Sequence, residues 1–282
     1  MKLLALATQF DSLQEDAAEA DISIWKEALF GAELLLLQLS PVRYGWGVPH
    51  GDGSAVVLIP GFLGTDGYLT QLRAWLQRIG YVPYLSGIGL NAECPNLLIQ
   101  YRLNETIKRA LDKTGRKIHL IGHSLGGVIA RSVASQHPDQ VASVITLAAP
   151  FRGTVVHQAV LRAAEMVRKN ILREHGKGVL PACYTARCTC NFLNSLRRNV
   201  PESVMETAVF THDDGIVDWR YCITGDPDKD FEVPGTHIGL VFNPTVYTIL
   251  ANRLATAQQF DAAVKVDDYP AGQTCDGQCS HC

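Results

Sequence analysis

Apolar and polar positions along the middle of the chain predict strands and helices in regular alternation. Unbroken apolar, β-branched runs are typical of buried strands, whereas apolar residues recurring every three or four positions are typical of helices. The predicted strands cover residues 55–59, 81–85, 117–121, 141–147, 206–210 and a short stretch near 231–233. The predicted helices between them cover residues 69–79, 96–113 and 127–134. This order indicates an α/β fold with a mostly parallel central sheet and helices on both faces.

Two segments depart from this alternation. Residues 11–39 carry apolar groups at helical spacing and end in four leucines before a Ser-Pro pair, which predicts a helix. Apolar residues such as Trp25 and Leu36 suit a membrane-surface or dimer helix, but the face lacks Lys and Arg enrichment, so we expect it to pack on the outside of the domain. Residues 151–205 contain a long amphipathic helix candidate over 155–174 and are expected to form a lid.

The chain is therefore divided into a core with one insertion and two terminal extensions. We expect an N-terminal helical extension over 1–50, a core formed by 51–150 and 206–260, a lid or cap insertion over 151–205, and a cysteine-containing tail over 261–282. A chain of 282 residues, 47% of them hydrophobic, is long and apolar enough to bury a sizeable core.

Charge and hydropathy exclude some partners and leave others open. The net charge of −3 argues against a general nucleic-acid binder, and no apolar run reaches the roughly 18 residues that span a bilayer. Contact with a membrane surface or lipid interface stays open, as does the oligomeric state. Gln9 and Asp11 interrupt the apolar N-terminus before it could act as an export signal, so we expect a cytoplasmic protein, although the cysteine content leaves a secreted or periplasmic location open.

The eight cysteines are spaced unevenly along the chain. Three of them lie within the polar residues 275–282, where their spacing is weak support for a metal site, and no metal is expected. A disulfide between Cys222 and either Cys188 or Cys190 is predicted from placement alone. Such a bond would join the end of the insertion to the loop region that follows strand 206–210.

One five-residue motif carries most of the chemical information. Between the predicted strand 117–121 and helix 127–134 lies Gly122-His123-Ser124-Leu125-Gly126. Strand, G-x-S-x-G and helix in this order form a sharp turn that lifts a nucleophilic serine above the sheet edge. The two glycines leave room for that turn. We therefore assign Ser124 as the nucleophile, and we interpret His123 as a packing residue that points elsewhere.

A serine hydroxyl becomes a good nucleophile when a base, oriented by a carboxylate, removes its proton. His237 is the preferred base because it lies in a short loop after the last predicted strand and before the last helix. Asp214 is the preferred carboxylate because it lies in the loop after strand 206–210 and precedes Gly-Ile-Val; Asp213 and Asp218 stay as alternatives.

Two backbone N–H groups are expected to stabilise the oxyanion. One belongs to Leu125, directly after the nucleophile, and the other to Phe62 in the glycine-flanked turn after strand 55–59. Leu63 and Phe151, with the insertion helix, are expected to line an apolar acyl pocket.

Over about residues 53–255 the chain resembles an α/β-hydrolase of the lipase/esterase type. Residues 58–64 resemble the oxyanion motif of bacterial lipases, with Pro60 in place of their common histidine, and residues 121–127 match their nucleophile motif closely. Residues 214–217 and 236–240 are similar to the acid and base segments of small bacterial triacylglycerol lipases.

The resemblance implies the order Ser124, Asp214, His237, ester hydrolysis and no organic cofactor. Calcium, which some relatives hold, has no clear ligand set in this sequence. The expected function is a serine carboxylic-ester hydrolase, an esterase or lipase, that forms an acyl-enzyme with aliphatic acyl esters or lipids. An acyltransferase with the same triad is the alternative, and a non-catalytic binding protein on the same fold is disfavoured because the candidate triad is complete.

Overall fold

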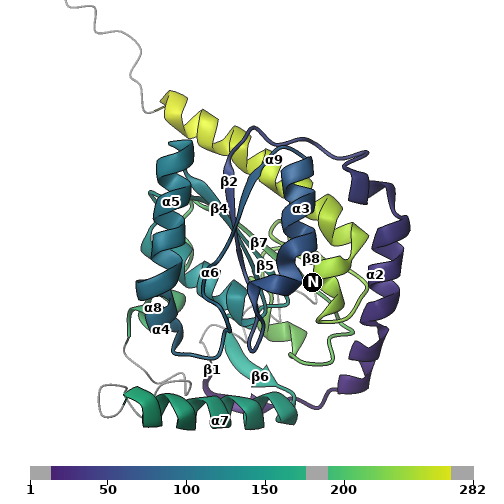
Figure 1. The fold of residues 1–282 in the computed structure, drawn as a ribbon, viewed down its shortest axis with the longest axis vertical. Helices are drawn as coiled ribbons and strands as arrows, with labels where there is room; N and C mark the ends of the chain where they lie inside the picture. Colours follow the sequence, from purple (N-terminus) through teal and green to yellow (C-terminus); the bar gives the residue numbers. More distant parts are fainter. Residues whose placement is uncertain (1–13, 176–189, 268–282) are drawn as a thin grey trace, which may run out of the picture.

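The computed structural model describes residues 14–175 and 190–267. At its centre lies a parallel six-stranded sheet with the strand order β3-β2-β4-β5-β7-β8 (Figure 1). Its strands are β2 (Ala55–Ile59), β3 (Val82–Leu85), β4 (Ile118–His123), β5 (Val141–Leu147), β7 (Met205–Phe210) and β8 (Asp230–Glu232). The four central strands are almost wholly buried, as expected for a parallel sheet that is covered on both faces.

Helices cover both faces of this sheet. In the described residues they are α2 (Phe30–Leu39), α3 (Thr70–Arg78), α4 (Pro95–Leu98), α5 (Asn104–Thr114), α6 (Leu125–Gln136), α7 (Gln158–His175), α8 (Asn191–Leu196) and α9 (Pro244–Asp267). A π-helical stretch, Ile99–Leu103, joins α4 to α5. Short 3₁₀ turns flank several helices, including η1 (Ile24–Leu29) directly before α2.

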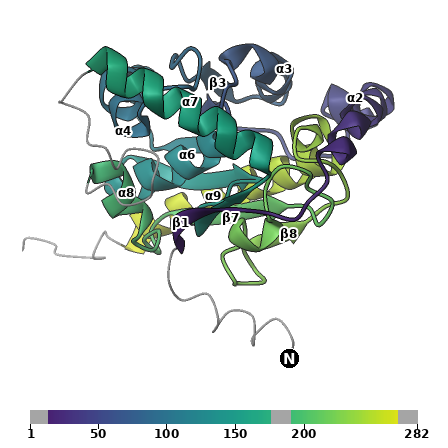
Figure 2. The same ribbon diagram turned by 90° about the horizontal axis from the view of Figure 1, so that it is seen from below.

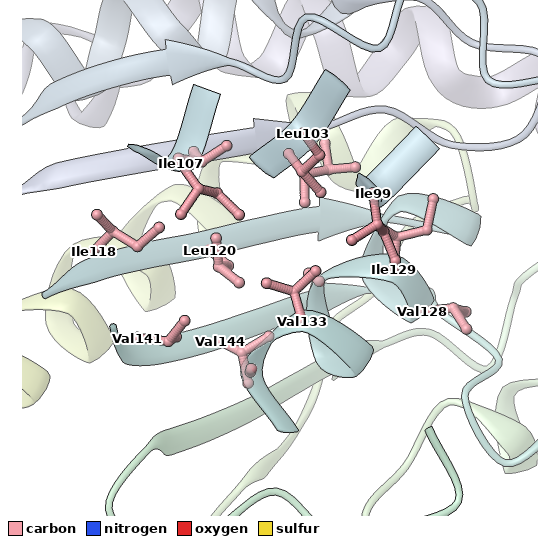
Figure 3. Packing of buried hydrophobic residues seen from close by; sticks show 14 of the residues in the cluster. Ile99, Leu103, Ile107, Ile118, Leu120, Val128, Ile129, Val133, Val141 and Val144 are labelled. Atoms are coloured by element: carbon pink, nitrogen blue, oxygen red, sulfur yellow. The ribbon is translucent and has the colours of Figure 1, made fainter. Parts of the chain in front are cut away.

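Two hydrophobic clusters hold the layers together, one on each face of the sheet. On one face, α5 and α6 pack against β4 and β5, where Leu120, Val133 and Val144 are among the residues in contact (Figure 3). On the other face, α3 and α9 pack through Trp75 and Tyr247, and Leu37 of α2 joins the same cluster. Both clusters consist mainly of buried side chains, so the sheet is a stiff platform for the loops at its carboxyl ends.

The six strands and the helices between them confirm the predicted α/β alternation to within a few residues. The first segment differs from the prediction. Residues 14–19 form a strand, β1 (Gln14–Glu19), which pairs in parallel with β6 (Gly153–Val156), and helical structure begins only at η1. Pairing with a distant strand here overrides the local helical spacing, because β preference depends on the neighbouring strand.

Two further helix boundaries differ from the prediction. The insertion helix α7 begins at Gln158 rather than 155, because the residues before it form β6. The final helix α9 extends to Asp267, past the expected core boundary at 260. Within the described ranges, no helix combines the length and apolar character needed to cross a membrane.

The structure has no disulfide between Cys222 and Cys190, so this one of the two predicted pairings is wrong. Cys222 is a buried free thiol within a cluster formed by Val156, Phe210 and Val217, whereas Cys190 packs in other clusters beside the cavity described below. Burial raises the pKa of the Cys222 thiol well above its ordinary value, and the nearby carboxylates add to this effect. Cys188 lies outside the described residues, as do the three cysteines of the tail.

Candidate active site

Ser124 lies at the turn between β4 and α6, in a strained backbone conformation with φ 53° and ψ −127°. A non-glycine residue at positive φ is uncommon and marks a constrained position. The turn is held by a hydrogen bond from the Ser124 N–H to the carbonyl of Leu147 (2.8 Å). A Cβ at Gly122 would overlap the backbone of α6, and one at Gly126 would overlap the carbonyl of Ile59. Only glycine therefore fits on either side of this turn.

Asp214 lies in the loop after β7 and is almost fully buried. Its Oδ1 accepts hydrogen bonds from the backbone N–H groups of Ile216 (2.8 Å) and Val217 (2.7 Å), and its Oδ2 lies 2.8 Å from Nδ1 of His237. The other candidate carboxylates face elsewhere. Asp213 is 70% exposed and pairs with Lys26, and Asp218 pairs with Arg220.

His237 lies in the loop that follows β8, and its side chain is buried. Burial disfavours the imidazolium, but the adjacent Asp214 carboxylate and, more weakly, the charge of Glu27 outweigh that cost. The pKa of His237 is therefore raised above its ordinary value. Because Nδ1 faces the carboxylate, Nε2 is the ring nitrogen left to exchange a proton with a reacting group.

A cavity of about 930 Å³ at the carboxyl end of the sheet is lined by all of the predicted site residues except Asp214, which contacts His237. Its walls include Ser124, His237, Phe62, Leu63, Leu125 and Phe151. Residues of α7 and β6 close another side of it. Figure 2 views the molecule from this end, where α7 and β1 lie across the sheet. Most of the lining is apolar, so the cavity suits an aliphatic group next to a polar reacting centre.

The turn between β2 and α3 places Phe62 at the wall of this cavity. Around it, the Gly61 N–H donates to the Tyr68 hydroxyl (2.6 Å) and the Leu63 N–H to the carbonyl of Asn91 (2.9 Å). The buried Asn91 side chain donates a hydrogen bond to the carbonyl of Pro60 (2.8 Å). Pro60, which stands where bacterial lipases commonly have a histidine, is therefore held in place by the Asn91 amide. Leu125 is the first residue of α6, at the positive end of that helix dipole.

The interpretation of His123 as a packing residue is incomplete. Its Nε2 lies 2.9 Å from the carbonyl oxygen of His237, and its Nδ1 lies 3.0 Å from the Tyr68 hydroxyl. A carbonyl only accepts, so Nε2 carries the proton and Nδ1 accepts from the Tyr68 hydroxyl. Burial, together with the charge of His237, lowers the pKa of His123 to about 3, which keeps this imidazole neutral. A chain of hydrogen bonds thus links Gly61 to the backbone of His237.

Two buried glutamates from the N-terminal segment of residues 24–39 also contact this region, and neither was predicted from the sequence. Glu27 of η1 accepts hydrogen bonds from the backbone of the loops that hold Asp214 and His237. Glu33 of α2 accepts from the backbone N–H and the hydroxyl of Thr236. The only sequence signal for them is that acidic residues interrupt an otherwise apolar stretch, which is unusual for a helix that packs by its apolar face.

No group of three or more His, Cys, Asp or Glu side chains in the described ranges is arranged to hold a metal ion. The polar chemistry of the cavity consists of a serine at a strained turn, a histidine hydrogen-bonded to a buried carboxylate, and backbone N–H groups at a helix N-terminus. The fold and this arrangement define a protein of the α/β-hydrolase fold.

Comparison with known proteins agrees with that class. A family model described as the alpha/beta hydrolase fold matches residues 55–173. A triacylglycerol lipase of Burkholderia plantarii is 35% identical over 140 residues, covering 45% of this chain and 37% of the relative. A triacylglycerol lipase of Pseudarthrobacter phenanthrenivorans is 38% identical over 113 residues, covering 35% of this chain and 34% of the relative. The chain thus spans little more than a third of the length of these curated relatives.

Among solved structures, the monoacylglycerol lipase of Paleococcus ferrophilus aligns with 76% of this chain and 96% of its own, at 15% identity and a TM-score of 0.48. The matched part of this chain is thus similar to proteins of the α/β-hydrolase fold, two triacylglycerol lipases among them.

Proposed function

We propose that the protein is a serine carboxylic-ester hydrolase that acts through an acyl-enzyme on aliphatic acyl esters. The observation that carries the proposal is the constellation in one cavity: Ser124 at a strained turn, and His237 hydrogen-bonded to the buried Asp214. The similarity to triacylglycerol lipases supports the same reaction class.

In this mechanism the hydroxyl oxygen of Ser124 attacks the ester carbonyl carbon, and Nε2 of His237 takes the hydroxyl proton. The carbonyl π electrons move onto oxygen and form a tetrahedral intermediate. Its collapse breaks the bond to the leaving alkoxide, which receives the proton from His237. A water molecule, deprotonated by His237, then attacks the acyl-enzyme and releases the carboxylic acid and free Ser124. Asp214 fixes the tautomer of His237 and stabilises the imidazolium that forms in each step.

The N–H groups of Phe62 and Leu125 are proposed to stabilise the oxyanion. Both residues border the cavity beside Ser124, and Leu125 opens α6, whose dipole favours negative charge there. Donors of this kind each lower the barrier by about 3 kcal/mol when they are preorganised.

The acyl chain is proposed to occupy the apolar part of the cavity, against Leu63, Phe151 and the inner face of α7. Leu63 is half exposed at the rim, whereas Phe151 is fully buried and lies beneath the Arg131 guanidinium (4.6 Å to the ring centroid). In this arrangement α7 acts as the cover of the site, which is the lid role expected for the insertion.

Hydrolysis of p-nitrophenyl esters from acetyl to palmitoyl tests the proposal, with Ser124→Ala as the comparison. We expect the intact protein to hydrolyse the esters and the variant to lose on the order of 10⁴-fold or more in kcat. The chain-length optimum would then measure how much of the cavity the acyl group fills. If the folded protein hydrolyses none of these esters, the proposal is wrong.

A further inference from the structure

Glu27 occupies an unusual position for an acidic residue, because its carboxylate is directed into the protein and is only 7% exposed as a residue. Its Oε1 accepts hydrogen bonds from the N–H of Gly215 (2.9 Å) and of His237 (3.0 Å), and its Oε2 accepts from the N–H of Ile238 (2.9 Å). One side chain therefore connects the residue that follows Asp214 with His237 itself and its next neighbour.

We propose that Glu27 is a positioning residue of the active site, which clamps the Asp214 loop and the His237 loop together and so holds the pair in register with Ser124. The inference rests on the proposed ester hydrolysis for the role of the triad, but the contacts of Glu27 are independent of it. The N-terminal segment is then part of the catalytic framework rather than an extension packed on the outside.

The clamp needs a carboxylate, because all three partners are backbone N–H groups, which can only donate. A carboxylate offers acceptor sites on both oxygens, whereas an amide of the same shape replaces one oxygen with a donor. At Glu27 that change leaves at least one of the three N–H groups without its acceptor, which is costly at a site shielded from water.

The fit around Glu27 also depends on Gly215. A Cβ at this position would lie 2.9 Å from Oε1 of Glu27 and 2.7 Å from the carbonyl oxygen of Ser23, closer than real Cβ atoms approach. The acid loop can reach the carboxylate because a glycine follows Asp214. The same glycine was part of the reason for choosing Asp214 from sequence, and the structure gives it a second role.

Glu33 makes a related but more adaptable contact. Its Oε1 accepts from the Thr236 N–H (3.1 Å), and its Oε2 accepts from the Thr236 hydroxyl (2.6 Å). A hydroxyl can donate or accept, so an amide at position 33 could still satisfy Thr236 by reversing that bond. Burial, with repulsion from Glu27, raises the pKa of Glu33. The two glutamates therefore differ in how much their contacts depend on the charge.

The charge of Glu27 also acts on the base. Three charged or titratable groups face His237. Asp214 contacts its Nδ1, Glu27 accepts a hydrogen bond from its backbone N–H, and the ring centroid of His123 lies 4.9 Å from that of His237. Glu27 itself faces Glu33 as its other charged neighbour. The negative charge of Glu27 favours the imidazolium and raises the pKa of His237. Its removal should lower that pKa, while a purely structural contact would leave it unchanged.

The experiment compares Glu27→Gln with Glu33→Gln and with Glu105→Gln, an exposed site on α5 that serves as the matched control. The concentration of competent sites in each variant is measured by stoichiometric labelling with a fluorophosphonate, so that kcat refers to folded sites. The pH midpoint of His237 is measured twice, from kcat/KM against pH and from the NMR titration of its imidazole, which needs no substrate.

We expect Glu27→Gln to lower kcat about 10-fold or more with KM within twofold, because small misplacements of a catalytic group are costly. The midpoint of His237 should fall by roughly half a pH unit or more. Glu33→Gln should lose less than threefold in kcat, and Glu105→Gln should match the wild type. Equal kcat and an equal midpoint in Glu27→Gln and Glu105→Gln would overturn the proposal, as would a loss explained wholly by fewer competent sites.

If Glu27→Gln does not fold, Glu27→Asp tests the proposal instead. This variant keeps the negative charge but moves the carboxylate one methylene away from the three N–H groups. A fall in kcat of at least threefold at unchanged KM supports the clamp, and an unchanged kcat overturns it. Failure of the proposed function looks different: wild type and Glu105→Gln would both hydrolyse no ester. The NMR midpoint would then test the clamp alone, and no difference between Glu27→Gln and Glu105→Gln would overturn it.

Discussion

The central sheet and the N-terminal segment of residues 24–39 bury opposite kinds of side chain. In the sheet, Leu58 and Val144 are fully buried, and apolar residues fill the space between strands and helices. In the N-terminal segment, Glu27 and Glu33 are each only 7% exposed, whereas Trp25 is 84% exposed. Most of the large apolar side chains of this segment are exposed, and Leu37 is the one that is fully buried.

The difference shows that burial follows what the neighbouring backbone offers. The strands satisfy each other's N–H and C=O groups, so the space beside them is best filled by apolar groups. The loops that hold Asp214 and His237 leave strand pairing and present N–H groups toward η1 and α2. Acidic side chains satisfy these donors, which is why the inner face of the segment is acidic. The segment supplies hydrogen bonds to the site and little hydrophobic core.

The largest change in activity that would test this contrast between sheet and N-terminal segment is expected at Asp214, in the loop after β7 that both regions contact. Asp214→Asn should lower kcat/KM about 10⁴-fold, because the amide no longer holds His237 in the productive tautomer. Asp213→Asn is the matched control at the next position, where the carboxylate is exposed and pairs only with Lys26 at the surface. Steady-state kinetics on one ester would show the difference. Similar losses in the two variants would mean that the loop, rather than the Asp214 contact, is what matters.

Within the N-terminal segment, two adjacent leucines separate the inner face from the outer one. Leu37→Ala should lower the free energy of unfolding by about 2–5 kcal/mol, because Leu37 is fully buried against the cluster of α3 and α9. Leu36→Ala should change it by less than about 0.5 kcal/mol, because Leu36 is 58% exposed. Urea denaturation measures both. A cost at Leu36 equal to that at Leu37 would show that the outer face is covered in solution.

A smaller effect is expected at the turn after β2, where the N–H of Phe62 is proposed to stabilise the oxyanion. Tyr68→Phe removes the acceptor of the Gly61 N–H and the donor to His123, leaving polar groups unsatisfied beside the site. We expect kcat to fall about 10-fold with little change in KM. Tyr101→Phe, at an exposed position, is the control. An unchanged kcat in Tyr68→Phe would show that this chain of hydrogen bonds does not position the turn.

The pH dependence should be the mildest signature. In the proposed mechanism His237 acts as a base and must be neutral, so kcat/KM should rise with pH through the pKa of this residue. That pKa is raised by Asp214 against the opposing effect of burial, so the midpoint of the acid limb should lie above the ordinary 6.5. His123 stays neutral over this range and should add no second limb. A midpoint at or below 6.5 would contradict the electrostatics described for the site.

The sequence was sufficient for the sheet because its strands are local patterns. Residues 55–59 and 141–147 are apolar runs whose length matches buried strands, and the structure has strands within these bounds. The serine turn could also be predicted, because its strand, its G-x-S-x-G motif and its helix follow one another along the chain. The structure shows that Gly122 is required by a contact within the turn and Gly126 by the end of β2. Asp214 and His237 could be chosen because chain order and loop position narrowed the candidates to a few.

The features that could not be predicted from the sequence depend on contacts between segments that are distant along the chain. Glu27 lies 210 residues from His237, and no local spacing predicts that the side chain of Glu27 contacts the backbone of His237. The pairing of β1 with β6 is equally non-local, so residues 14–19 were predicted as helix. The neutral state of His123 depends on its burial between Tyr68 and the His237 loop, which only the fold reveals.

The most direct test of the proposed mechanism asks whether Ser124 is the residue that the His237–Asp214 pair activates. The folded protein would be incubated with a fluorophosphonate, and the adduct would be located by peptide mapping, in parallel with His237→Ala. The proposed mechanism predicts one adduct, on Ser124, and labelling slowed by at least about 10³-fold in the variant. An adduct on another residue, or equal labelling rates in the two proteins, would contradict it.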